Sequence, residues 1–60
     1  MYYTVEIDMK DGRDAPEKNF TYYDMAKACY DSIKLTNSVV YKSLSKTTRE
    51  NGTEILEREG

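Results

Sequence analysis

The sequence contains no histidine and no tryptophan, and it has a single cysteine among its 60 residues. Without histidine, neither a Ser-His-Asp nor a Cys-His catalytic arrangement can be built. Zinc sites use clustered cysteine and histidine ligands, so we expect no zinc site, and we expect no other metal or cofactor. One cysteine cannot form an internal disulfide, which is typical of a reducing compartment. These absences predict a non-enzymatic protein of the cytoplasm.

Long apolar runs are absent as well. No run approaches the ~20 residues of a membrane span, and the first residues lack the order of a signal peptide. Ile, Leu, Val and Phe together supply only ten of the 60 residues, a share that borders on that of disordered chains. Six tyrosines add apolar area, and a net charge of −2 is too small to hold the chain open. We therefore predict one small folded domain over residues 1–60, located in the cytoplasm.

A β-strand is the clearest feature of the first residues. Apolar side chains alternate with polar ones at Tyr3, Val5, Ile7 and Met9. This period of two predicts a half-buried strand over residues 2–10. Asp11-Gly12 then favours a turn, and residues 11–20 are expected to form a loop in which a short strand around Lys18–Phe20 is an option.

A helix is predicted over residues 22–35. Thr21 and Asp24 have the spacing of a capping box, and Phe20 and Met25 have that of a hydrophobic staple. Asn37 is expected to end the helix in a left-handed conformation. At 100° per residue one face collects the apolar side chains, with Tyr23 and Tyr30 at its flank. Its members are Tyr22, Met25, Ala26, Cys29 and Ile33.

A hairpin is predicted over residues 38–59, because Asn51-Gly52 is a strong signal for a two-residue type I′ turn. Such a turn pairs Glu50 with Thr53, Thr48 with Ile55, Lys46 with Glu57 and Leu44 with Glu59. Val40, Leu44 and Ile55 then share one face, and Val39, Tyr41 and Leu56 share the other. The expected fold is α+β, with one helix packed on a three-stranded, mainly antiparallel sheet in the order β-α-β-β.

One helix can cover only one face of such a sheet. The uncovered face is then expected to carry a set of partner-binding residues, namely Tyr2, Val39, Tyr41 and Leu56. Exposed tyrosine and aliphatic side chains are common at protein interfaces. A homodimer is one use of this face, because it would enlarge a small core. The alternative is a β-bulge near Ser43 that returns these side chains to the core.

Charge is unevenly distributed along the chain. Residues 25–49 carry a net charge of +4, whereas residues 1–24 and 50–60 each carry −3. Lys42, Lys46 and Arg49 could form a nucleic-acid-binding strip with the neighbouring hydroxyl residues. The sequence pI near 5.0 opposes this alternative, because nucleic-acid modules are usually basic. Cross-strand pairing of Lys46 with Glu57 and of Arg49 with Glu54 would also neutralise the strip.

Acidic residues allow two further interpretations. A row of carboxylates could imitate a phosphate backbone, although a net charge of −2 is small for a mimic. Its members would be Glu6, Asp8, Asp11, Asp14 and Glu17. Glu6 and Asp8 could instead hold Mg²⁺, but no convergent catalytic groups accompany them. Cys29 lies in the middle of the apolar helix face, so we expect it to be a small buried side chain.

The layout resembles small accessory proteins of phages and mobile elements, including some anti-CRISPR inhibitors. It is carried by three segments in order, which are Tyr3–Ile7, Phe20–Tyr22 leading into a helix with Ala26, and Glu50–Leu56 around Asn51-Gly52. The resemblance implies a non-catalytic inhibitor that occupies a surface of a host defence complex such as a CRISPR nuclease. The alternative function is that of a small nucleic-acid-binding regulator.

Overall fold

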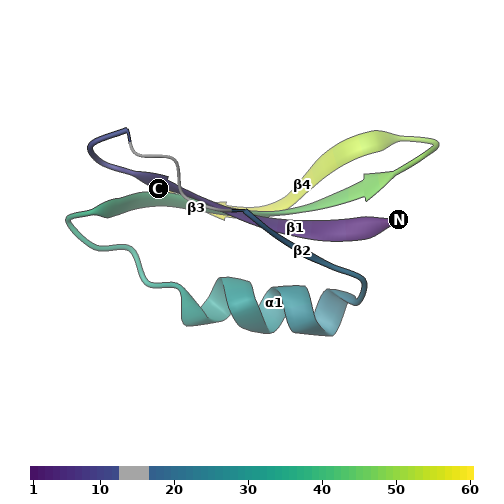
Figure 1. Cartoon of the computed structure of the whole chain (residues 1–60), viewed down its shortest axis with the longest axis horizontal. Coiled ribbons are helices and arrows are strands. Elements are labelled where there is room, and N and C mark those ends of the chain that lie inside the picture. Colours follow the sequence, from purple (N-terminus) through teal and green to yellow (C-terminus); the bar gives the residue numbers. More distant parts are fainter. Residues whose placement is uncertain (13–16) are drawn as a thin grey trace.

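The computed structural model describes residues 1–12 and 17–60. These residues form one antiparallel sheet with the strand order β2-β1-β3-β4, and a single helix lies across one face of it (Figure 1). The elements are β1 (Tyr2–Met9), β2 (Lys18–Phe20), α1 (Tyr23–Ser32), β3 (Val39–Thr48) and β4 (Gly52–Glu59). The α+β prediction is confirmed, but the sheet has four strands instead of three. The optional strand at Lys18–Phe20 is present and pairs with β1.

The side chains beneath the helix follow from the pairing register. Val5 lies opposite Leu44 of β3, and residues directly opposite each other share a side of the sheet. Helix α1 packs on β1, β2 and β3. Ala26 and Tyr30 of the helix meet Val5 and Leu44, and these four residues form the buried apolar core. No helix in the described part of the chain has the length and apolar character needed to cross a membrane.

The helix is shorter than predicted and turned about its axis. Its N-cap residue is Tyr22, which makes no side-chain capping hydrogen bond, so the predicted capping box at Thr21 is wrong. Met25 is 59% exposed instead of facing the core. The ring of Tyr23 packs edge-on against Tyr3 with centroids 5.6 Å apart. This contact directs Ala26 and Tyr30 toward the sheet, because residues three or four apart lie on one helix face.

The C-terminal hairpin has a different register from the predicted one. Thr48 pairs with Gly52, so the loop has three residues, 49–51, and Gly52 at the start of β4 has a positive φ of 69°. A register shift follows, because Ser45 lies opposite Ile55 whereas Leu44 lies opposite Glu57. Leu56 is therefore the extra residue of a β-bulge. Ile55, predicted to share the core face with Leu44, is 54% exposed.

A second bulge lies at the start of β3. Asp8 pairs with Tyr41 and Met9 pairs with Val39, which leaves Val40 without a partner in β1. Val40 was also predicted on the face of Leu44, yet it is 43% exposed. Asn37 does not take the predicted left-handed conformation, since only glycines have positive φ among the described residues. The helix instead ends at Ser32 and passes into extended backbone at Ile33.

Candidate interaction face

The face of the sheet opposite α1 carries no second layer within the described part of the chain (Figure 1). The residues of this face are identified from the pairing register, because paired residues share a side of the sheet. The 2.8 Å hydrogen bond from Thr4 Oγ1 to Asn19 Oδ1 shows this for one such pair. Thr47 and Thr53 are likewise joined by their hydroxyls at 3.0 Å. We call this surface the open face. It consists of Tyr2, Thr4, Glu6, Asp8, Asn19, Tyr41, Ser43, Ser45, Thr47, Thr53, Ile55 and Arg58.

Small hydroxyl side chains form the centre of the open face. Thr4, Ser43 and Ser45 are only 5–7% exposed although no layer covers them. The larger side chains around them shield them, and Ser45 also donates a hydrogen bond to the Thr4 carbonyl at 3.4 Å. Tyr2 and Ile55, by contrast, are about half exposed. The open face therefore has a low polar floor with apolar side chains standing at its edges.

Two of the four residues predicted to bind a partner belong to the open face, and a third, Leu56, is the bulge residue next to it. Tyr2 and Tyr41 belong to it by their pairing with Thr47 and Asp8. Leu56 adjoins Ile55 in the bulge and is 38% exposed, so this bulge does not return it to the core. Val39 is the exception. It lies opposite Met9, on the same side of the sheet as Val5 and Ile7. The bulge at Val40 shifts the alternation of β3 by one residue and so places Val39 on the helix side.

Sequence reasoning missed Ile55, the most exposed aliphatic residue of this face. The assumed two-residue turn placed it opposite Thr48, whereas the real loop places it opposite Ser45. The signal that could have found it is the polar run before Gly52. A three-residue loop is the next most common hairpin connection, and a glycine directly after it can take a positive φ.

Charges on the open face are separated across the sheet. In its neutral form Glu6 of β1 donates a hydrogen bond to Glu17, which favours that form and raises the pKa of Glu6. Burial and the repulsion of Glu17 and Asp8 raise the pKa of Glu6 further. Arg58 lies two strands away from Glu6, on β4, and forms no ion pair among residues 1–12 and 17–60. Asp14, predicted to extend the acidic row, lies outside the described residues.

Lys42, predicted as part of a basic strip, lies on the helix side and is 5% exposed. Its Nζ donates hydrogen bonds to the carbonyls of Tyr30 at 2.9 Å and Ile33 at 2.7 Å. The same ammonium lies 4.2 Å from the centre of the Tyr30 ring and 3.9 Å from Glu59. The last turn of α1 has no basic residue of its own. Lys42, although it belongs to β3, therefore caps the C-terminal end of α1, where the helix dipole favours a cation.

The other two bases of the predicted strip are separated from each other. Lys46 shares the helix side with Lys42 and lies opposite Glu54, not opposite Glu57 as predicted. Arg49 lies in the exposed turn between β3 and β4. The structure therefore does not assemble the three side chains into one exposed strip. A phosphate backbone could not reach the Lys42 ammonium without displacing its helix carbonyls.

Lys27 is the base that does hold Glu57. Its Nζ donates to both carboxylate oxygens at 2.7 and 2.6 Å, and it also lies 3.2 Å from Asp31. The hydrogen bond to Glu57 is the main reason why the pKa of Lys27 lies well above its ordinary value. The predicted pairing of Lys27 with Asp31 is confirmed. This cluster ties β4 to α1, so the helix side of the sheet has matched charges.

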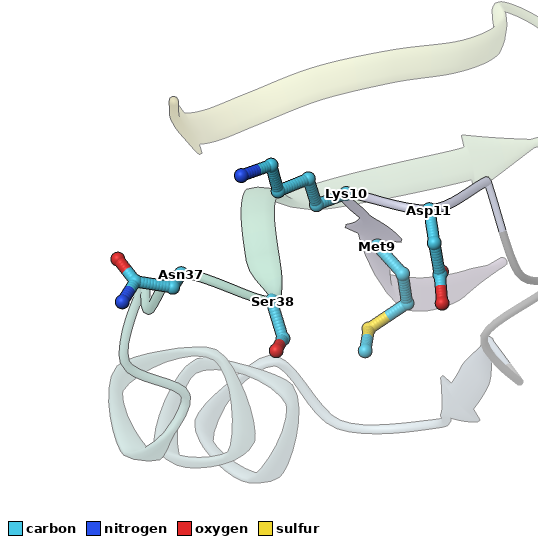
Figure 2. A pocket seen from close by; sticks show the side chains of 5 residues that line it. All are labelled: Met9, Lys10, Asp11, Asn37 and Ser38. Carbon is cyan, nitrogen blue, oxygen red and sulfur yellow. The ribbon is translucent and has the colours of Figure 1, made fainter.

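Two hollows lie away from the open face. One has a volume of about 450 Å³ and is lined by Met9, Lys10, Asp11, Asn37 and Ser38. In Figure 2 the side chains of Met9 and Ser38 point to one side of it, whereas Lys10 points away. The other, of about 230 Å³, lies between α1 and β1 and includes the half-buried Cys29. Within the described ranges no three acidic or cysteine side chains are grouped so as to hold a metal ion.

Comparisons with known protein families, with curated proteins and with solved structures found no significant match.

Proposed function

We propose that this protein is a non-catalytic binding protein that acts by placing its open face against another protein. The observation that carries the proposal is the set of exposed apolar side chains around an uncovered sheet face, while the described residues contribute only four side chains to the buried apolar core. Tyrosine and aliphatic side chains at such a site contribute more to association than to folding. The exposed side chains are Tyr2, Ile55 and Leu56, and the half-buried Tyr41 lies on the same face as Tyr2.

We propose an accessory protein of a phage or mobile element that occupies a surface of a host defence complex, such as a CRISPR nuclease. The small size, the absence of histidine and the β-strand, helix, hairpin layout support this class of function. The nucleic-acid alternative has less support, since Lys42 is engaged at the end of α1. An inhibitor of this class works by occupancy, so its effect should depend on stoichiometry and on the open face.

The proposal is tested with paired surface variants. Tyr2→Lys and Ile55→Lys change exposed residues of the open face, whereas Tyr22→Lys and Met25→Lys change residues of similar or greater exposure on the helix segment. Each variant is co-expressed with defined CRISPR nucleases, and plasmid clearance is measured. We expect the wild type and the helix variants to block clearance and the open-face variants to lose this effect while keeping their circular dichroism. Equal clearance with all five proteins would contradict the proposal.

A further inference from the structure

We infer that the open face binds a second copy of this chain, related to the first by a two-fold axis that runs parallel to the strands. This inference rests on the proposed role of the open face as a protein-binding surface. It names the partner from the chemistry of the face itself. A host protein that uses the same face would compete with the second copy.

The charges across the open face define the axis. At one level of the sheet Glu6 lies beside Glu17, Ser43 lies opposite Glu6, and Arg58 lies opposite Ser43. The row therefore runs from two carboxyl groups at the β2 side to a guanidinium on β4. A two-fold rotation about an axis that runs along the strands, over the middle of the sheet, leaves each residue at its level along the strands. It reverses the order of the strands, so β4 of one copy lies over β2 of the other and β3 lies over β1. Arg58 of each copy then faces Glu17 of the other, beside Glu6, which faces Ser43.

The competing two-fold axis lies in the plane of the sheet but crosses the strands. With this axis each strand lies over the same strand of the second copy, and the two ends of the strands are exchanged. Arg58 would then face Ile55 of the second copy, and Glu6 would face Thr4. The carboxyl pair would then meet no cation. The axis along the strands matches both sets of unpartnered charges twice, because a two-fold interface repeats each contact. Complementary charges fix the register and orientation of an interface more than its affinity.

The area of the face is compatible with a dimer of moderate affinity. Strand β1 and strand β4 each have 8 residues, β3 has 10 and β2 has 3. With a rise of about 3.3 Å per residue and about 4.8 Å between strands, the sheet plane measures about 450 Å². Two copies bury about twice this area before the relief of the side chains is added, which brings the total to the ~1,000 Å² of a specific interface.

The low floor of the face suits close packing of two sheets. Under this rotation Tyr2 of one copy lies over Thr47 of the other, and Tyr41 lies over Asp8. The short side chains of Thr4, Ser43 and Ser45 between these positions let the two sheets approach each other. Tyrosine provides apolar area together with a hydroxyl for such a polar floor. The dimer also protects a chain whose own apolar core is very small.

Charge exchange tests the inference. Arg58→Glu and Glu17→Arg alter exposed residues, and each places like charges together twice in its own homodimer. Sedimentation velocity at about 100 µM chain, a concentration that populates complexes of micromolar Kd, should show a wild-type dimer and a largely monomeric form of each variant. Mixed in equal amounts, the two variants should form a heterodimer, because the altered position 58 of one faces the altered position 17 of the other with opposite charge, and the native Arg58 faces the native Glu17.

Arg49→Glu is the matched control, since it makes the same charge change in the exposed turn outside the open face. It should dimerise like the wild type. A monomeric wild type, or the absence of recovery on mixing, would overturn the dimer. The proposed function would survive that result if Tyr2→Lys and Ile55→Lys still abolished inhibition. If those two variants also kept full inhibition, the proposed function would fall independently of the oligomeric state.

Discussion

The same strands form both faces of this sheet, but the side chains of the covered face pack within the chain, whereas several side chains of the open face remain exposed. On the covered face Val5 and Leu44 are buried against the helix, and Lys42 is surrounded by carbonyl oxygens and a ring. On the open face Tyr2 and Ile55 remain about half exposed, and Arg58 has no ionic partner among the described residues. Interactions that are complete within one chain stabilise folding. Interactions that are incomplete identify where a second protein can bind.

The largest difference between the faces should be seen when an aliphatic side chain is truncated. Leu44 is fully buried and Ile55 is 54% exposed. Leu44→Ala should lower the free energy of unfolding by about 2–5 kcal/mol, which is most of the stability of a domain this small. Ile55→Ala should lower it by less than about 1 kcal/mol. Urea denaturation measured at a dilution that leaves the chain monomeric checks this. Similar losses for both variants would contradict the assignment of the faces.

A smaller effect is expected from the two lysines that share the helix side of β3. Lys42→Met removes two hydrogen bonds to helix carbonyls and should cost about 1–3 kcal/mol. Lys46→Met is the matched control, because no hydrogen bond of its ammonium is present within the described residues and its side chain is only half-buried. It should cost less than about 0.5 kcal/mol. Amide exchange at the C-terminal end of α1 should accelerate only in the Lys42 variant, and unchanged exchange would show that the cap is dispensable.

Local patterns predicted the elements of this fold well. The alternation at Tyr3, Val5 and Ile7 gave the first strand and its buried side, because a period of two is a property of the strand itself. Helical periodicity located α1 and the inward positions of Ala26 and Cys29. The order of strand, helix and hairpin followed from these elements, and only the three-residue strand β2 was left as an option.

The candidate site was harder to predict because it depends on register. Two bulges, at Val40 and Leu56, each displace the alternation by one residue. The bulge at Val40 places Val39 on the helix side, whereas the three-residue loop of the hairpin places Ile55 on the open face. The role of Lys42 was also hidden, since its partners Tyr30 and Ile33 belong to a helix that packs against β3 only in the folded chain. Sequence spacing indicates which side chains alternate, whereas tertiary contacts decide where the alternation shifts.

The smallest expected effect concerns the carboxyl pair of the open face. The pKa of Glu6 is raised above its ordinary value of 4.5, chiefly by its hydrogen bond with Glu17 and further by burial and the nearby charges. A raised pKa means that the folded chain binds this proton more tightly than the unfolded chain does. The folded state is therefore penalised when Glu6 is ionised, above the raised pKa, and the penalty disappears as the pH falls below 4.5.

Glu6→Gln should accordingly stabilise the monomeric chain at pH 7, by about 0.5 kcal/mol or less because both carboxyl groups are exposed and screened. The gain should shrink through the interval between the raised pKa and 4.5 and be absent at lower pH. Glu50→Gln, in the exposed hairpin turn, is the matched control and should give no such pH-dependent gain. Thermal unfolding of dilute samples measures both variants across this range. Under dimerising conditions Glu6→Gln should lose part of its advantage, because Arg58 of the second copy then offsets the repulsion that the substitution removes. A stabilisation independent of pH and concentration would mean that Glu6 and Glu17 do not repel each other, and that the open face lacks the uncompensated charge to which we assign its orientation.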